Sequence, residues 1–457
     1  MNMKQRDGKA STEQGGKPVN HKTNGGTERM PPIDLSADKK LLRHEQLLKI
    51  QNIALADTFP ELLLGEAFLA EASKQLELLD HFSALMIRPD PLNDQTGNTL
   101  IKTGLFFSLF DIVDHVCKSN SGFWGIYDND CVACFFETKT FPDPALNLAE
   151  KIHREMEGRE NITVSTGIAF YPQLTYKKED IIENARKALE HAHLSGHNSI
   201  VEFDSVSLNI SGDKLYQQGN IDGAIAEFEK ALLLDPENVN VFNSLGVCFG
   251  VQGKHQTAID MFKNVMKIAP DDVMAPYNIG LAYLMIGDKD KAQEFFLHAF
   301  SLDQNQLEVV IHIGRIYLEK KDPEKAKEYF KKAVTIDENS GTGHRFLGEC
   351  YSKLNRHEKA INSYVKAIKL NANDAHSLSA LACLYAEQEL NRDIAIVFGR
   401  QSVKLSPATA LFRQRLGKVY FMFEMFDEAL KEFKCATELG QDCESFILAI
   451  QNREKKK

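Results

Sequence analysis

Two consecutive stretches decide the fold of this chain: residues 273–306, VMAPYNIGLAYLMIGDKDKAQEFFLHAFSLDQNQ, and residues 307–340, LEVVIHIGRIYLEKKDPEKAKEYFKKAVTIDENS. When the two stretches are aligned, their small residues coincide, and so do their aromatic residues. The shared positions are Gly280 and Gly314, Tyr283 and Tyr317, Ala292 and Ala326, and Phe296 and Phe330. The sequence therefore contains an internal repeat with a period of 34 residues.

The repeat extends in both directions from these stretches. The alanine column continues at Ala224, Ala258, Ala360, Ala395 and Ala429, and the glycine column at Gly212, Gly246, Gly348 and Gly417, with Ala382 in the sixth unit. Each unit has the pattern of two amphipathic helices, whose small residues let the pair approach closely. The pattern predicts seven units: 205–238, 239–272, 273–306, 307–340, 341–374, 375–409 and 410–443. Because no unit can cover its own apolar face, we expect an all-α solenoid that residues 444–457 close as a capping helix.

Residues 205–443 resemble the tetratricopeptide repeat (TPR), whose diagnostic columns they fill. The resemblance implies that a protein or peptide partner binds along the exposed face of the first helix in each unit. The candidates for partner binding on that face are Tyr277, Leu281, Ile311, Arg315, Arg345 and Lys418. Some members of the family clamp a C-terminal carboxylate with Lys and Asn residues, a set that this sequence lacks. A solvated helix face without a ligand is the alternative interpretation.

Residues 50–204 have a different pattern, in which strands and helices alternate. We expect strands at residues 82–87, 125–136 (two strands around a polar turn), 162–170 and 200–203, and helices at residues 145–157 and 179–194. This order predicts an α+β domain in front of the solenoid. The fold class expected for the chain is therefore multi-domain, α+β followed by all-α.

The order of these elements and three motifs resemble the diguanylate cyclase (GGDEF) family. The motifs are Thr163-Val-Ser-Thr-Gly-Ile-Ala169, the helix Asn184–His193 with Gly196-His-Asn198, and Asp57-Thr-Phe-Pro-Glu-Leu-Leu-Leu-Gly65. The resemblance implies a nucleotidyl cyclase-like, ferredoxin-like sheet covered by helices. It also implies an enzyme in which two carboxylate-bound divalent cations hold a triphosphate.

The residues that this chemistry needs are replaced. Arg88 stands where the resemblance places the first metal ligand, and Cys131 stands at the second. Asp128 and Asn129 replace the two glycines of the turn, and their side chains crowd a triphosphate. We therefore predict a degenerate GGDEF-like domain that is not an enzyme, with no catalytic, cofactor-binding or metal-binding residues. Whether it still binds a nucleotide is left open.

Composition limits the other function classes. The chain has 457 residues, with 64 acidic against 54 basic side chains and a formal charge of −10, which argues against a nucleic-acid partner. Eight dispersed cysteines suit a reducing compartment, and no apolar run has the length of about 18 residues that indicates a membrane span. We expect a cytoplasmic protein in which residues 1–34 form a disordered tail and residues 35–56 an amphipathic helix or linker.

Together these features predict a non-catalytic scaffold or adaptor that binds its partner through the TPR face, in bacterial signalling. Two alternatives stay open. In one, the degenerate domain is a nucleotide-binding receptor that regulates partner binding by the repeats. In the other, it is an active diguanylate cyclase with an altered metal site.

Overall fold

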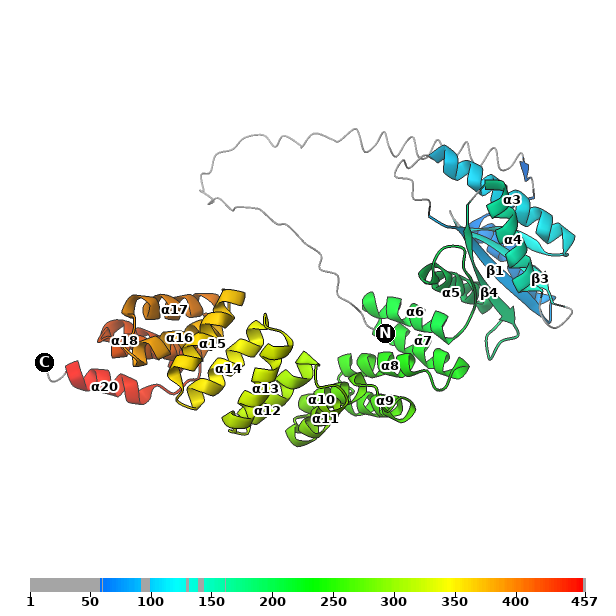
Figure 1. Cartoon of the computed structure of the whole chain (residues 1–457). Coiled ribbons are helices and arrows are strands. Elements are labelled where there is room, and N and C mark those ends of the chain that lie inside the picture. The colour runs from blue at the N-terminus through cyan, green and yellow to red at the C-terminus, as the bar shows by residue number, and fades with distance from the viewer. Residues whose placement is uncertain are drawn as a thin grey trace, which may run out of the picture. The chain divides into compact units, whose positions relative to one another are not determined.

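The computed structural model describes residues 58–59, 61–91, 99–128, 131–138, 144–160 and 162–454. The predicted tail at residues 1–34 and the predicted linker at residues 35–56 lie outside these residues, as does the turn at residues 129–130. A small mixed sheet with its helices comes first along the chain, and helices alone follow it (Figure 1).

The sheet has five strands in the order β2-β3-β1-β4-β5. The strand bounds are β1 (Phe82–Pro89), β2 (Phe123–Asp128), β3 (Cys131–Glu137), β4 (Val164–Tyr171) and β5 (Ile200–Glu202). β1 is the central strand and pairs antiparallel with β3 and β4, while β4 pairs in parallel with β5. The apolar run at residues 82–87 is buried along its whole length, which confirms the prediction of a buried strand.

Helices cover both faces of this sheet. α2 (Gly65–Glu77) and α5 (Asp180–Ser195) pack on the face that carries Ala133 and Phe135 of β3. α3 (Thr99–Ser119) and α4 (Ala145–Glu160) cover the opposite face, where Cys117 of α3 meets Cys134 of β3. The sequence pattern predicted α4 and α5 but not α2 or α3. The expected α+β arrangement is therefore present in its coarse form, a small sheet covered by helices.

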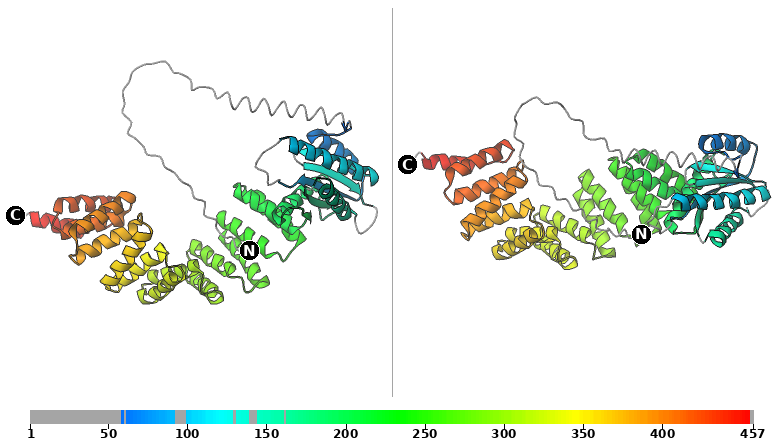
Figure 2. Two further views of the ribbon diagram at one scale, coloured as in Figure 1. Left: turned by 45° about the horizontal axis from the view of Figure 1, so that its top comes forward. Right: turned by 90° about the horizontal axis from the view of Figure 1, so that it is seen from above.

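Between Ser205 and Glu438 fourteen helices form seven consecutive pairs. The bounds are α6 (Ser205–Gln217), α7 (Ile221–Leu234), α8 (Val239–Val251), α9 (His255–Ile268), α10 (Met274–Ile286), α11 (Lys289–Leu302), α12 (Leu307–Glu319), α13 (Pro323–Ile336), α14 (Gly341–Lys353), α15 (His357–Leu370), α16 (Ala375–Glu387), α17 (Arg392–Leu405), α18 (Ala410–Met422) and α19 (Phe426–Glu438). α20 (Glu444–Glu454) follows the last pair. In both views of Figure 2 the pairs follow one another in sequence order.

The glycine column has a direct steric reason in the structure. A Cβ atom added to Gly246, in the first helix of its unit, would lie 2.5 Å from the ring of Phe262 in the second helix. The same approach recurs at Gly280 with Phe296 (2.6 Å) and Gly314 with Phe330 (2.7 Å). Each ring therefore occupies the space that the missing side chain leaves, and the aromatic and glycine columns depend on each other.

The turn between the two helices of each unit uses the same backbone conformation every time. One residue in each turn has a positive φ angle. From the first unit to the seventh these residues are Gly219, Gly253, Gly287, Lys321, Asn355, Glu389 and Glu424. Glycine adopts this left-handed conformation without strain, while other residues are disfavoured in it. The first three units therefore make the turn at low cost, as does the fifth with Asn355, because asparagine tolerates this conformation, whereas Lys321, Glu389 and Glu424 are strained.

The sixth unit departs from the column pattern, as its sequence indicates. Ala382 and Gly399 stand where the other units have glycine and an aromatic ring. A Cβ atom on Gly399 would lie 2.8 Å from the side chain of Leu416 in α18. A side chain of the next unit thus takes the place of the missing ring.

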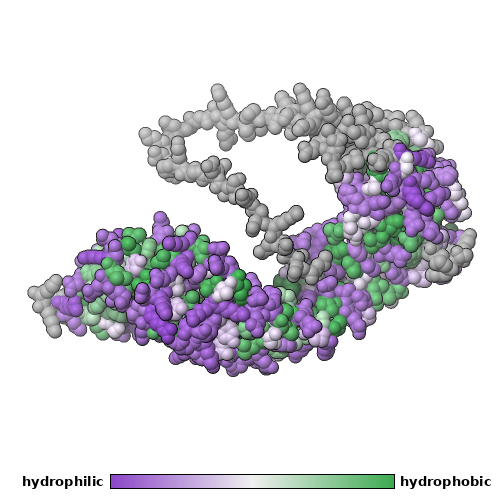
Figure 3. Space-filling model, in the orientation of Figure 1, coloured by the Kyte–Doolittle hydropathy of each residue, from purple (hydrophilic) through white to green (hydrophobic). Residues whose placement is uncertain are grey.

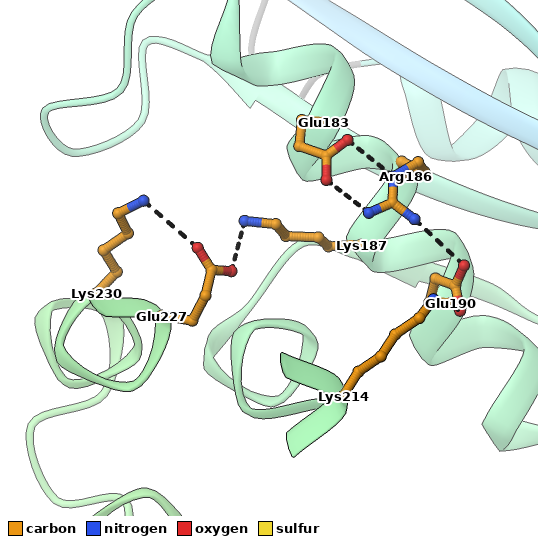
Figure 4. A network of polar contacts seen from close by, with 7 residues as sticks. All are labelled: Glu183, Arg186, Lys187, Glu190, Lys214, Glu227 and Lys230. Atoms are coloured by element: carbon orange, nitrogen blue, oxygen red, sulfur yellow. Dashed lines mark hydrogen bonds and ion pairs between the residues drawn. The ribbon is translucent and has the colours of Figure 1, made fainter. Parts of the chain in front are cut away.

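The sheet region and the first helix pair share one hydrophobic core. It joins Ala188 and Leu189 of α5 with Leu208 of α6 and Phe228 of α7. At its edge, Nζ of Lys187 lies 2.5 Å from Oε2 of Glu227, and each side chain is only 10% exposed (Figure 4). Although burial acts to raise it, the hydrogen bond and charge of Lys187 hold the pKa of Glu227 below its ordinary value. α5 therefore covers the first repeat unit, as a capping helix would.

Candidate binding face on the first helices

The six candidate side chains come from four first helices. Tyr277 and Leu281 lie on α10, Ile311 and Arg315 on α12, Arg345 on α14 and Lys418 on α18. Residues four apart share one face of a helix. We use the name first-helix face for Val247, Met274, Tyr277, Leu281, Ile311, Arg315 and Arg345.

One part of the first-helix face is apolar and open to solvent. Val247 is 41% exposed and Met274 is 47% exposed, while Tyr277, Leu281 and Ile311 are partly buried. Figure 3 shows apolar patches, in green, that interrupt the polar surface of the helical units. Partly buried apolar side chains are already held in place, so they lose little entropy when a partner covers them.

Tyr277 is fixed by aromatic contacts on two sides. Its ring centroid lies 5.8 Å from that of Phe296 and 5.9 Å from that of His312. His312 in turn stacks on Phe296 at 5.0 Å. Burial and the nearby carboxylate of Glu308 raise the pKa of Tyr277, so its phenol stays protonated at neutral pH. His312 was not among the sequence candidates. It aligns with Phe346 of the next unit, whose ring is stacked in the same way.

Phe346 organises the two candidate arginines. The guanidinium carbons of Arg315 and Arg345 lie 5.9 Å and 4.7 Å from the centre of its ring. Phe346 also stacks on Phe330 at 5.0 Å. Two like charges thus share one aromatic ring, and each cation–π contact stabilises its guanidinium in place.

Lys418 does not join this group. Its Nζ lies 5.3 Å above the ring of Phe446 in α20. Gln414, one turn earlier on α18, donates a hydrogen bond to the carbonyl oxygen of Asp442, in the segment that leads into α20. Lys418 therefore lies against the helix that was expected to cap the array, and this contact of its side chain is one that the sequence pattern did not reveal.

The sheet region holds the residues that the cyclase resemblance singled out. Asp90 is 6% exposed and accepts hydrogen bonds from Oγ of Ser165 (2.5 Å) and the backbone N–H of Asn198 (2.8 Å). Burial acts to raise its pKa, but these hydrogen bonds and one from Thr163 lower it overall. Cys131 is 1% exposed and lies in the core. Asp90 thus joins β1 to β4 and to the loop before β5, and Cys131 serves in packing.

The residues that the structure describes contain no group of three or more His, Cys, Asp or Glu side chains placed to hold a metal ion. None of their helices has both the length and the apolar character needed to cross a membrane.

Family models match four segments of the helical array. A model described as TPR repeat matches residues 212–250, and one described as Tetratricopeptide repeat matches residues 277–306, 307–340 and 346–374. The chain therefore contains tetratricopeptide repeats, which generally act as scaffolds for protein–protein interaction. No curated protein matches the chain.

Several solved structures are similar to part of this chain. One, from a functional characterization of Pseudomonas aeruginosa pilF, is 22% identical and covers 47% of this chain and 97% of that chain, with a TM-score of 0.43. MamA is 25% identical over 37% of this chain and 93% of that chain, with a TM-score of 0.34. YrrB is described as a TPR protein with an unusual peptide-binding site. It is 17% identical and covers 40% of this chain and 95% of that chain, with a TM-score of 0.36.

Proposed function

We propose that this protein is a non-catalytic adaptor that binds a protein or peptide partner through its first-helix face. One observation carries the proposal. The first-helix face combines exposed apolar side chains on α8 and α10 with two arginines that share the ring of Phe346. An apolar anchor beside charged groups is the usual composition of a protein-binding surface.

The two parts of the face have different roles in this proposal. Tyr277 is held by Phe296 and His312, so a partner side chain packs against a rigid surface. Arg315 is exposed and Arg345 partly exposed, so they act mainly on the encounter with acidic groups of the partner. We expect Tyr277 to control the dissociation rate and the arginines to control the association rate.

The experiment starts by recovering a partner with the full chain as bait. A fragment that begins at residue 205 would expose Leu208 and Phe228, which are buried in the core shared with α5. Binding kinetics of the purified partner are then measured for three variants. They are Tyr277→Ala, Arg315→Glu with Arg345→Glu, and the control Lys366→Glu with Lys404→Glu, which makes the same charge change on second helices.

Tyr277→Ala should speed dissociation, with a loss of about 2 kcal/mol in binding free energy. The arginine pair should slow association and reverse its salt dependence, while the lysine pair should leave both nearly unchanged. If the partner binds the tyrosine and arginine variants with unaltered kinetics, the first-helix face is not its site.

For the sheet region we propose a degenerate GGDEF-like domain that serves the adaptor as a folded platform, in a cytoplasmic, bacterial signalling setting. The burial of Cys131 and the use of the Asp90 carboxylate in hydrogen bonds support a structural rather than a metal-binding role. Purified protein incubated with GTP and divalent cations tests this part of the proposal.

A further inference from the structure

Basic groups form a row across successive first helices. The row consists of Arg315 on α12, Arg345 on α14, His376 on α16 and Arg415 on α18. Counted from the start of their units, the first three occupy the ninth, fifth and second positions, so each step moves about one helical turn toward the helix N-terminus. These three groups therefore run diagonally across their units, and Arg415, at the sixth position of its unit, lies about one turn back toward the C-terminal end of its helix.

These cations are only partly neutralised. Arg345 lies 3.7 Å from Asp374, whose carboxylate also accepts hydrogen bonds from the N–H and Oγ of Ser377 at the start of α16. Arg315 and Arg415 have no ion pair within the part of the chain that the structure describes. The row thus holds three arginines, two of them without an ion pair, on a chain with a formal charge of −10.

His376 lies in the row with charged groups on both sides. Its ring meets that of Phe412 edge-on at 4.8 Å, which buries part of the imidazole, while the residue stays partly open to solvent. Burial, Arg345 and Arg415 lower its pKa, while Asp374 and Glu349 oppose them. The imidazole is therefore mainly neutral at neutral pH, and an anion brought next to it would favour its protonation.

We propose that the partner presents an extended acidic segment to this row, with carboxylates at about every third residue, and that binding takes up a proton at His376. The inference rests on the proposed function and names the chemistry of its partner. Because the guanidinium carbons of Arg315 and Arg345 lie 5.9 Å and 4.7 Å from the centre of one ring, they are at most about 11 Å apart, and three residues of extended chain cover about 10 Å. A carboxylate at every third residue therefore reaches one basic group after another.

The probe is a fluorescent 15-residue peptide with glutamate at every third position and serine or glycine elsewhere. Its dissociation constant for the full chain is measured by anisotropy at pH 6 and pH 8, where glutamate stays ionised. An isomeric peptide with its glutamates in one block and a single-stranded oligonucleotide of equal charge are measured alongside it. Arg345→Gln and His376→Gln test the row, and His298→Gln, an exposed histidine on α11, is the control.

We expect the spaced peptide to bind several-fold more tightly than the block peptide. It should also bind about 3- to 10-fold more tightly at pH 6 than at pH 8, because carboxylates next to His376 raise the pKa of its imidazole and so favour binding where the imidazole is protonated. Arg345→Gln should weaken binding about tenfold. His376→Gln should bring the pH ratio close to one, and His298→Gln should keep it.

Equal binding of the two peptides, tighter binding of the oligonucleotide, or a pH ratio that survives His376→Gln would each overturn the inference. Absence of any peptide binding would overturn it as well. Because the probe has no apolar residue, such a result leaves the test of the proposed function at Tyr277 standing.

Discussion

One turn of α8 separates two glycines whose replacement by alanine should have opposite effects on stability. A Cβ atom on Gly246 would lie 2.5 Å from Cε1 and 2.6 Å from Cζ of Phe262. On Gly250 it would meet nothing within 4 Å. The two substitutions make the same chemical change in the same helix, so the main difference between them is the contact with the ring.

The expected magnitudes follow from two competing effects. Replacing glycine by alanine in a helix gains about 1 kcal/mol, and somewhat less near the helix end where Gly250 lies. Overpacking a filled core costs roughly 1–3 kcal/mol, and Phe262, which is 4% exposed, has little room to move. Gly250→Ala should therefore stabilise by about 0.5 kcal/mol and Gly246→Ala should destabilise by about 1 kcal/mol.

Urea unfolding measures both changes with two independent probes. Far-ultraviolet circular dichroism follows the helices, and fluorescence follows Trp124, the one tryptophan of the chain, which packs against Phe110 in the sheet region. The double variant Gly246→Ala with Phe262→Leu should lose less stability than the two single losses combined, because leucine frees the space that alanine needs. If Gly246→Ala stabilises as much as Gly250→Ala, the steric explanation of the glycine column is wrong.

Lys321→Gly should stabilise by roughly 0.5 kcal/mol in urea unfolding, because it relieves the left-handed φ of 62° at that turn; a loss would contradict this. Lys187→Met should cost about 2–3 kcal/mol, since Glu227 stays buried and keeps only the more exposed Lys230, 3.5 Å away, as its cation. Adding Glu227→Leu should restore most of the loss, as thermal melts can check. Folding lowers the pKa of Glu227, so its ionised carboxylate stabilises the folded chain fully above the ordinary glutamate pKa of about 4.3. This stabilisation declines as the pH falls through the lowered pKa of the folded state. The free energy of unfolding of wild type and of Glu227→Gln, measured as a function of pH in acid, tests the prediction. The chain should form no cyclic di-GMP from GTP with magnesium or manganese, and product that disappears on Asp90→Ala would refute this.

The periodic columns were sufficient to predict the helix pairs, because one steric relation, a glycine beneath a ring, repeats every 34 residues and leaves a mark on the sequence. α3 was missed because its residues, such as Phe106, Phe107 and Leu109, are apolar around most of the helix and give no clear period.

The candidate site was predicted less completely than the fold. His312 and Phe346 stack on the preceding unit at equivalent positions, but serine, asparagine and alanine stand there in other units, so no column reveals the role. The contact of Lys418 with Phe446 and the ion pair of Lys187 with Glu227 join segments far apart in sequence. Pairings of that kind depend on the three-dimensional fold and have no local pattern.

The core shared by α5 and the first repeat unit limits which repeat units can be gained or lost during evolution. One end of the array is joined to the sheet region, and the other is closed by α20, so both ends are occupied by dedicated partners. An interior unit contacts only units like itself. Duplication or deletion of a whole unit between residues 239 and 374 would therefore leave the contacts at the two ends of the array intact, whereas loss of the first or last unit would not. We expect natural relatives of this chain to differ in length by multiples of one unit, in the interior of the array.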